Sequence, residues 1–213
     1  MGKLREGLIR DQQGQVRCWW CGDKPDYQHY HDSEWGFPVD DDARLFEKMC
    51  LEGFQSGLSW LTILRKRDNF RRAFANFEFE KIARWRAKSR TEKLLQDAGI
   101  VRHRGKIEAT LHNAKLAVSL AEEYGSLAAY FWQWEPEPSA RPKRVNKAAL
   151  MKLSKTPASI ALAKDLKRRG FRFFGPTTAY AFMQAMGLVN DHLEGCPTRV
   201  ACEQAREKFC RPS

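Results

Sequence analysis

The chain has 213 residues, and 37 Lys and Arg against 26 Asp and Glu give it a net charge of +11. Hydrophobic residues make up 43% of the chain, with 7 Trp and 13 Phe, which is enough for a buried core and excludes a largely disordered protein. The length fits one domain, or two small lobes that share a core. The excess of positive charge favours a polyanionic partner, and nucleic acid is the leading class.

The sequence shows neither a secretory signal nor a membrane span. Its first 17 residues, MGKLREGLIRDQQGQVR, contain no apolar core. The longest uncharged stretch, 173–190, includes Gly, Pro, Thr, Gln and Asn, so we expect a buried helix there. Six Cys without an export signal favour a reducing compartment. In such a compartment, clustered Cys and His residues indicate a metal site rather than disulfide bonds. We therefore expect a cytoplasmic protein with no membrane partner.

The predicted elements are helices joined by loops. Residues 1–16 are a polar extension, and residues 18–38, rich in Cys, His and aromatic side chains, are expected to form an ordered loop. Three aspartates at 40–42 predict the start of a helix that ends in a break at 53–57, followed by a helix over 60–67. Further helices are expected over 79–85, 91–97, 106–124 and 158–169. Strand signals are nearly absent, so the predicted fold class is all-α.

Near the end of the chain, the sequence KRRGFRFFGPTTAYAFMQAMG predicts two helices joined by a glycine-containing hairpin. Gly170 ends the first helix, and Pro176 stands at a first helical position, where its ring is tolerated. A hairpin that includes Gly175 and Thr177 can direct backbone N–H groups at a DNA phosphate without reading the base sequence. The alternative is an ordinary corner between core helices. A Pro-rich segment, 135–144, is expected to be a surface loop between two halves.

Potential metal ligands lie near both ends of the chain. They are Cys18, Cys21, His29 and His31 on one side, and His192 and Cys196 on the other. Zinc takes four sulfur or nitrogen ligands in a tetrahedron at closed structural sites, so a pair from each end would tie the two ends together. By spacing alone, either N-terminal Cys can combine with either N-terminal His. The alternative is a set of separate buried thiols and histidines without a metal.

Aromatic residues and one carboxylate form a second group. The aromatic residues of the predicted loop are Trp19, Trp20, Tyr27, Tyr30 and Trp35. Glu52 precedes Trp60 in the segment LEGFQSGLSW. Aromatic faces with a carboxylate suit a planar, cationic or amino-bearing ligand such as a nucleobase. In the same segment, Gly57 and Leu58 fit a loop tip that enters a DNA duplex. The alternative is that these aromatic residues belong to the core.

Four blocks of the sequence together resemble one family. They are RCWW…DYQHYHDSEWGFP, CLEGFQSGLSWLTILRKRDNFRRAF, LLQDAGIVRHRGKI and GFRFFGPTTAYAFMQAMGLVNDH. In these blocks, which run from about Arg17 to Cys196, the chain resembles the DNA-3-methyladenine glycosylase I family of bacterial repair enzymes. The agreement of several blocks in one order is far more specific than any single block.

The resemblance implies an all-α helix–hairpin–helix glycosylase fold over residues 17–196, formed as two lobes of one unit. The extension 1–16 and the basic tail 197–213 lie outside it, and nothing is carried over to them. The family's structural zinc ion, which joins the chain ends, would be bound here by Cys18, His31, His192 and Cys196.

The resemblance also implies a pocket for the damaged base. Its residues would be Tyr27, Tyr30, Glu52 and Trp60, with Glu52 as the catalytic carboxylate and Trp60 stacking on the base. Leu58 and the adjacent Gly57 fall where the family's duplex-probing tip lies. The DNA backbone would lie on the hairpin that contains Gly175 and Thr177.

One position bears on the mechanism. Many helix–hairpin–helix glycosylases place an Asp where this chain has Asn190, in the stretch Val189-Asn190-Asp191-His192. The methyladenine-specific family resembles this chain in lacking that carboxylate. A base alkylated at N3 is already cationic, so its glycosidic bond is weak and the leaving group needs no proton. Extraction, desolvation and orientation of the nucleotide then suffice for water to add at C1′.

These features predict a monofunctional enzyme that removes 3-methyladenine from damaged double-stranded DNA and leaves an abasic site. We expect a monomer that releases free 3-methyladenine and carries one structural zinc. One alternative is a zinc-stapled DNA-binding module without catalysis, although such a module would not need a base pocket. Another is a helical glycosylase with a different base specificity.

Overall fold

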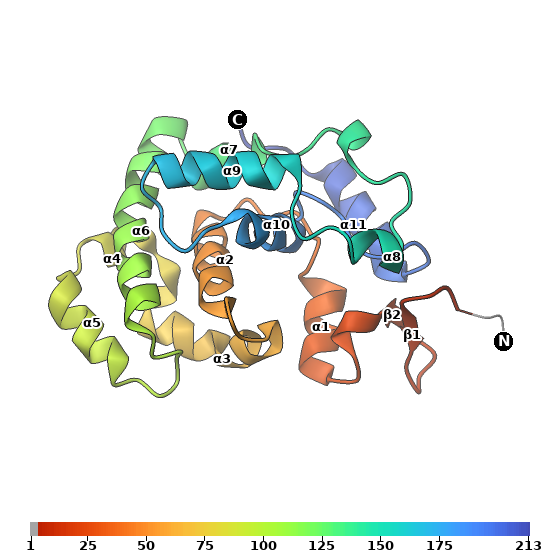
Figure 1. The fold of residues 1–213 in the computed structure, drawn as a ribbon, viewed down its shortest axis with the longest axis horizontal. Helices are drawn as coiled ribbons and strands as arrows, with labels where there is room; N and C mark the ends of the chain where they lie inside the picture. Colours follow the sequence, from red (N-terminus) through yellow and green to blue (C-terminus); the bar gives the residue numbers. More distant parts are fainter. Residues whose placement is uncertain (1–3) are drawn as a thin grey trace.

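The computed structural model describes residues 4–213, and helices make up most of it (Figure 1). A single two-stranded sheet lies near the N-terminus. The elements are β1 (Leu8–Arg10), β2 (Val16–Cys18), η1 (Trp19–Cys21), α1 (Pro25–Ser33), α2 (Asp42–Gln55), α3 (Trp60–Ala73), η2 (Ala75–Phe77), α4 (Phe79–Ala83), α5 (Ala87–Leu95), α6 (Arg104–Tyr124), α7 (Leu127–Trp132), η3 (Pro138–Ala140), α8 (Lys147–Leu150), α9 (Pro157–Arg168), α10 (Pro176–Ala185) and α11 (Pro197–Lys208).

Helix α2 runs through the middle of the molecule, between α10 and the helices α3 and α6 (Figure 1). Asp41 caps its N-terminus by accepting a hydrogen bond from the backbone N–H of Arg44, at 2.8 Å. Residues from Leu45 to Phe54 are all buried, including the charged ones. The helix is therefore surrounded by protein, and any charged side chain on it must find a partner inside the fold.

Helices α3 to α6 form a lobe on one side of α2, whereas α1, the sheet, α8 and α11 lie on the other side (Figure 1). Phenylalanines join the first lobe to α2. The Phe54 ring lies 4.6 Å from that of Phe70, and Phe74 and Phe77 continue the stack at 6.2 and 5.6 Å between ring centroids. All four rings are fully buried, so they form a continuous aromatic part of the core.

The fold is mostly helical, as predicted, but a small sheet that the sequence did not predict lies at the N-terminus. Residues 8–10 pair with residues 16–18 in an antiparallel hairpin, with Leu8 opposite Cys18. Leu8 packs on a small second core that contains Cys18, Leu193 and Cys196. The part of the extension from residue 4 onward is thus ordered, because it covers apolar surface that the helical core leaves open.

Several helices differ from the sequence expectations. The expected loop over 18–38 contains α1, which begins with Pro25 at a position where proline is tolerated. Helix α2 continues through Gly53 to Gln55, so the break is shorter than predicted. The basic tail contains α11, again started by a proline, and this helix buries Cys202 completely.

The predicted hairpin near the C-terminus joins α9 to α10. Gly170 has a φ of +94°, which a glycine adopts without strain and which ends α9. Asn113 of α6 holds the hairpin with two hydrogen bonds to the backbone of Arg172, both at 2.9 Å. Phe173, also in the left-handed region at +56°, is 46% exposed. The hairpin is therefore fixed to α6 and presents an exposed aromatic ring.

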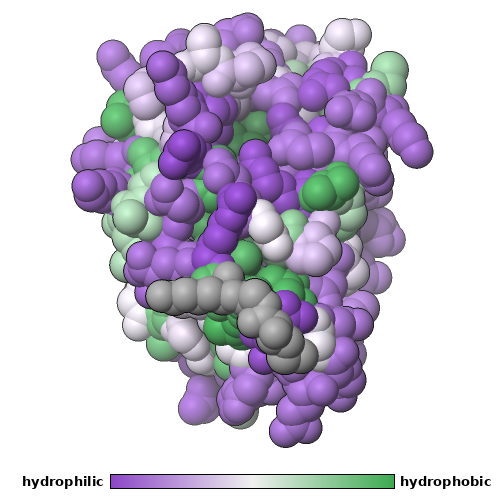
Figure 2. Space-filling model, turned by 90° about the vertical axis from the view of Figure 1, so that its right-hand side faces the viewer, coloured by the Kyte–Doolittle hydropathy of each residue, from purple (hydrophilic) through white to green (hydrophobic). Residues whose placement is uncertain are grey.

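No helix among residues 4–213 is both long and apolar enough to cross a membrane. The face that carries the N-terminal hairpin is mostly hydrophilic, and hydrophobic residues appear there only in small patches (Figure 2).

Candidate functional site

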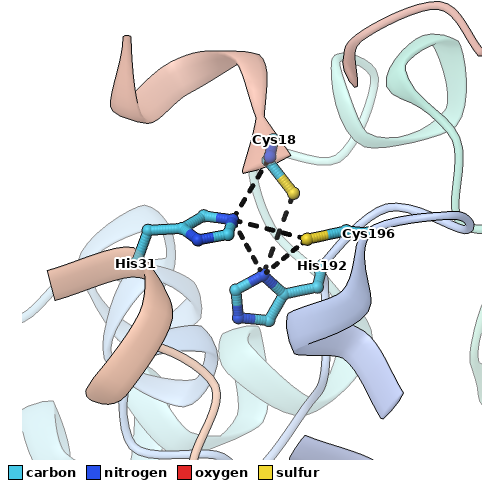
Figure 3. A group of neighbouring side chains, drawn as sticks. All are labelled: Cys18, His31, His192 and Cys196. Carbon is cyan, nitrogen blue, oxygen red and sulfur yellow. Dashed lines mark hydrogen bonds between the residues drawn. The ribbon is translucent and has the colours of Figure 1, made fainter. Parts of the chain in front are cut away.

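The structure brings four of the predicted metal ligands together (Figure 3). Cys18 comes from the end of β2 and His31 from α1, whereas His192 and Cys196 come from the segment between α10 and α11. All four are buried, and their ligand atoms lie within 4.8 Å of one another. The cluster therefore joins segments that are more than 160 residues apart in the sequence.

The distances in this cluster fit a tetrahedral ion. The Cys18 Sγ–His192 Nδ1 and Cys196 Sγ–His31 Nε2 distances are 3.8 and 3.7 Å, and the two imidazole nitrogens are 3.2 Å apart. Zinc–ligand bonds of usual length place tetrahedral sulfur and nitrogen ligands about 3.3–3.8 Å apart. The four groups are thus already spaced as ligands of one metal ion.

The outer partners of the two histidines fix which nitrogens face the cluster. His31 donates from Nδ1 to Asp32 at 2.7 Å, and His192 donates from Nε2 to the Trp35 carbonyl at 2.8 Å. The remaining nitrogens then carry lone pairs that point at each other. The Cys18 N–H donates to one of them, His31 Nε2, at 3.2 Å, and both thiols lie against them. Two imidazole lone pairs and two sulfurs that converge on one point also fit the ligand set of a metal.

The N-terminal hairpin takes part in this arrangement. Arg17 donates to both oxygens of Asp32, at 3.0 and 2.8 Å, and also pairs with Asp11 in the turn between β1 and β2. Although burial opposes the change, the Arg17 hydrogen bond lowers the pKa of Asp32. The carboxylate stays ionised and orients His31.

The other cysteines and the second histidine lie apart from the cluster. Cys21 donates to the Cys18 carbonyl at 3.1 Å, and exposed His29 contacts Ser33 on its own helix. Cys50 is buried in α2 and Cys202 in α11, whereas Cys210 is exposed. The alternatives that spacing left open are therefore separated by the fold.

The aromatic residues around Glu52 form a second site, a cavity of about 300 Å³. It lies between α1, α2, the start of α3, and the short helix α8. Its lining includes all four residues of the predicted base pocket, together with residues that the sequence did not single out. The lining residues are Trp19, Trp20, Tyr27, Tyr30, Trp35, Glu52, Gln55, Trp60, Leu150, Met151, Ala181 and Gln184.

Glu52 is only 5% exposed, and its charge is balanced from one helical turn earlier. Lys48 Nζ lies 2.8 Å from Glu52 Oε1 and donates to the Tyr30 hydroxyl at 2.8 Å. The same ammonium lies 3.2 Å from the centroid of the Trp60 ring, a cation–π contact. Burial lowers the pKa of Lys48 to about 8, against the opposing attraction of Glu52.

The two tyrosine hydroxyls of this cavity stay protonated, and the indole N–H of Trp60 lacks a hydrogen-bond partner among the described residues. Burial raises the pKa of Tyr27 to about 12, and it raises that of Tyr30 well above the usual range. Within the described part of the chain, the buried Trp60 Nε1 has no hydrogen-bond partner. A buried N–H without an acceptor is costly, and a ligand in this cavity could supply one.

The end of α2, which leads into the predicted tip, lies beside the hairpin. Leu58 is 40% exposed, and Gly57 precedes it with a φ of +83°. Lys106 holds the end of α2 by donating to the carbonyls of Phe54 and Ser56. A Cβ on Gly53 would come within 3.2 Å of the Phe173 carbonyl of the hairpin. One short stretch, from α2 to α3, thus links the cavity, the exposed tip and the hairpin.

The residue at the position of the missing carboxylate faces away from this cavity. Asn190 donates to the Arg199 carbonyl at 3.0 Å and to Glu203 at 2.8 Å, both on α11. The next residue, Asp191, is fully buried and accepts from the Tyr180 hydroxyl at 2.5 Å and from Gln184 at 2.8 Å. Neither side chain lines the cavity.

Comparisons with known proteins agree with the geometry. The methyladenine glycosylase family matches residues 20–200. The chain belongs to this family. DNA-3-methyladenine glycosylase 1 of Escherichia coli (strain K12) is 45% identical over 181 residues, which are 84% of this chain and 95% of that protein.

Two solved members of the methyladenine glycosylase family share the fold. A crystal structure of 3-methyladenine DNA glycosylase I is 48% identical, covers 85% of this chain and 98% of its own, and superimposes with a TM-score of 0.76. The enzyme from Staphylococcus aureus, solved to show how it recognises 3-methyladenine, is 35% identical with a TM-score of 0.78, over 86% of this chain and 96% of its own.

Lys48 is a residue of this site that no sequence motif marked. The signal that could have found it is a Lys four residues before Glu52 in the mostly apolar segment LFEKMCLEGF, a spacing that places both side chains on one face. Periodicity shows which residues share a face of the helix. Whether that face is exposed or buried depends on the neighbouring helices, which the sequence pattern does not show. The packing of α3 against α2, with Tyr30 of α1 bonded to Lys48, places the pair inside the protein.

Proposed function

We infer that this chain hydrolyses the N-glycosidic bond of 3-methyladenine in alkylated DNA and leaves an abasic site, which is the reaction that names its family. The observation that carries this inference is the cavity in which a buried carboxylate, Glu52, lies among aromatic faces. A flipped base fits such a site because its faces stack and its edge hydrogen-bonds.

We assign base recognition to Glu52, Trp60, Tyr27 and Tyr30. An ionised carboxylate only accepts hydrogen bonds, so Glu52 suits the exocyclic amine of adenine. Guanine presents a carbonyl oxygen at that ring position and would leave the carboxylate facing an acceptor. Trp60 offers a π-face to the cationic ring, and the two tyrosines complete the wall.

The proposed reaction needs little chemistry from the protein. The alkylated base leaves as a neutral molecule without being protonated, because the ring already carries a positive charge. The pocket extracts the nucleotide, excludes bulk water and orients the sugar, and one water then adds at C1′. Asn190 and Asp191 are engaged with α11 and α10, which supports a reaction without a second carboxylate. Glu52 is then the catalytic residue, through its contact with the departing base.

We propose that DNA lies across the exposed tip and the hairpin. Leu58 would fill the space left by the flipped nucleotide and offset part of the unstacking cost of a few kcal/mol. The helix–hairpin–helix from α9 to α10, with Gly175 and Thr177 exposed, would bind a phosphate through backbone N–H groups. The net charge of +11 supports binding that weakens with salt.

We propose zinc as the occupant of the Cys18, His31, His192 and Cys196 cluster. Two thiolates and two imidazoles are a usual ligand set for a closed structural site. A zinc ion there would hold the N-terminal hairpin and the segment after α10 together. Because all four ligands come from the protein, no open position remains for substrate.

We further propose that residues 17–196 act as one glycosylase unit and that the protein works as a cytoplasmic monomer. The extension 1–16 and the tail 197–213 would support this unit. The Arg17–Asp11 pair and the burial of Cys202 agree with such a role.

The test is base release from duplex DNA treated with a methylating agent, with the freed bases identified by chromatography. We expect 3-methyladenine to be freed and the phosphodiester backbone to stay intact until the abasic sites are cleaved chemically. Release of no base at all, with DNA still bound, would favour a DNA-binding module without catalysis. Strand cleavage coupled to release would contradict a purely hydrolytic enzyme.

A further inference from the structure

Lys48 is buried behind the residues that line the proposed base pocket, and no step of the proposed reaction uses it. Its side chain is 7% exposed. Its ammonium contacts Glu52 Oε1, the Tyr30 hydroxyl and the Trp60 ring, at 2.8, 2.8 and 3.2 Å. These are the same three groups that we assign to the alkylated base. A cation that belongs to the protein therefore already holds the groups that a cationic base would use.

Lys48 and the cationic base would share the negative charge of Glu52. Among residues 4–213, Lys48 is the one ion-pair or hydrogen-bond partner of the Glu52 carboxylate. The pair is electrically neutral as a whole, so the pocket presents less negative charge to a ligand than a free carboxylate would. A cationic ring that approaches Glu52 also approaches the ammonium, and like charges repel strongly in a dry site.

We propose that Lys48 is a specificity-determining residue: as the internal counter-ion of Glu52, it reduces the advantage of a cationic base over a neutral base of the same shape. This inference rests on the proposed function, because it takes the cavity around Glu52 as the base pocket. The ammonium must shift away from Glu52 or lose its proton before a cationic base gains the full attraction of the carboxylate.

The surroundings of Lys48 allow its charge to change near neutral pH. Burial lowers the pKa of Lys48 to about 8, while Glu52 on the same helix opposes this effect. Tyr30 of α1 stays neutral, and the more distant Arg67 of α3 is paired with Glu34 at 2.6 Å. Raising the pH through 8 therefore removes the ammonium charge and leaves the charge of Glu52 to the ligand.

The experiment compares a cationic and a neutral ligand that differ by one methyl group. The cationic probe is 3,9-dimethyladeninium, and the neutral probe is 9-methyladenine, which keeps the exocyclic amine and stays uncharged from pH 7 to pH 9. We would measure the Kd of each by quenching of tryptophan fluorescence at pH 7. The quantity of interest is the neutral Kd divided by the cationic Kd, since a general loss of affinity cancels in this ratio.

For Lys48→Met, which removes the charge and keeps most of the side-chain volume, we expect the ratio to rise on the order of tenfold or more. Lys81→Met is the matched control, because it removes the same charge from an exposed ion pair with Glu78 on α4. The ratio in that control should equal that of the wild type. An unchanged ratio in Lys48→Met, or an equal loss of both ligands, would overturn the inference.

The wild-type protein gives a second arm that needs no variant. Between pH 7 and pH 9 its ratio should rise, because Lys48 loses its proton over this range. A flat ratio over this range would contradict the proposal even if Lys48→Met fails to fold. If the wild type binds neither probe at any pH, the base pocket itself is wrong, and that failure is distinct from a selectivity that ignores Lys48.

Discussion

The Cys/His cluster and the base pocket are neighbours that differ in how far their polar groups are satisfied. His31 belongs to the cluster and the preceding residue, Tyr30, belongs to the pocket, and the Trp20 ring packs against both. In the cluster, both imidazoles have outer hydrogen-bond partners and inward lone pairs. In the pocket, Trp60 Nε1 has no partner within the described residues, and Glu52 depends on Lys48.

This difference separates structural from functional roles. If the four converging groups bind the proposed zinc, no position is left for a substrate, so we expect the cluster to contribute to stability. A cavity with an unpaired buried donor and a carboxylate whose one partner is a lysine gains from a ligand. The variants below should therefore affect folding in one region and base binding in the other.

The largest effect is expected from breaking the cluster. His192→Ala removes one ligand and leaves two buried thiols without a full set of partners. We expect a loss of about 3–5 kcal/mol in unfolding free energy, together with loss of the bound metal. Thermal unfolding and metal analysis of the purified protein measure both. His29→Ala, an exposed histidine outside the cluster, should keep metal and stability; equal losses in the two variants would contradict the assignment.

Substitutions in the pocket should lower the affinity for the base and leave the stability of the fold nearly unchanged. Trp60→Ala removes the stacking face, and base–aromatic stacking contributes about 1–3 kcal/mol, so 3-methyladenine should bind roughly 10- to 100-fold more weakly. Trp60→Phe keeps a face and loses the unpaired N–H, and its Kd should lie between those of the wild type and Trp60→Ala. Equilibrium binding of the free base tests this. Identical Kd values in all three proteins would remove Trp60 from the pocket.

A smaller effect is expected at the exposed tip. Leu58→Ala should lower the rate on duplex DNA up to about tenfold, because the gap left by the flipped nucleotide is filled less well. Its affinity for free 3-methyladenine should not change. Val200→Ala, which also trims an exposed hydrophobic residue, serves as the control for solubility and folding. A parallel loss in both assays for Leu58→Ala would show that Leu58 supports the base pocket and does not act on the duplex.

The smallest effect lies outside both regions, at the end of α9. Asp165 accepts from Arg168, Arg169 and the Tyr130 hydroxyl. Although burial opposes the change, these bonds lower the pKa of Asp165 to about 2. A lowered carboxyl pKa stabilises the fold above pH 4, and this contribution is lost as the pH falls from about 4 to 2. Asp165→Asn should reduce that loss by about 1 kcal/mol in acid unfolding. An identical acid profile would show that the bonds contribute nothing.

Local patterns in the sequence predicted the helices well where caps and periodicity coincide. The aspartates before α2, Gly170 after α9 and Pro176 at the start of α10 all mark boundaries that the structure contains. The hairpin of β1 and β2 has strands of three residues each, too short for an alternating pattern to emerge. Its formation depends on Leu8 finding apolar surface from residues near 193, which no local pattern contains.

The two candidate sites also differ in how much of each the sequence could predict. Cys and His are rare enough that six residues contained the four of the cluster, and the fold then separated Cys21 and His29 from it. The aromatic residues and Glu52 were also visible, and the cavity includes them. Lys48 was not, because a lysine on a helix is normally solvated. Only the packing of α3 against α2, with Tyr30 of α1 bonded to Lys48, makes it a buried partner of Glu52.

The most direct test of the account is the ratio of 3-methyladenine to 7-methylguanine released from methylated duplex DNA by the wild type and by Glu52→Gln. An amide can donate as well as accept, so it no longer penalises the guanine carbonyl. We expect the wild type to release 3-methyladenine with a strong preference. In Glu52→Gln, release of 3-methyladenine should slow and the ratio should fall by roughly 10- to 100-fold, as the loss of about 1–3 kcal/mol of discrimination requires. A ratio that stays the same in the two proteins would contradict the role of Glu52 in selecting the base.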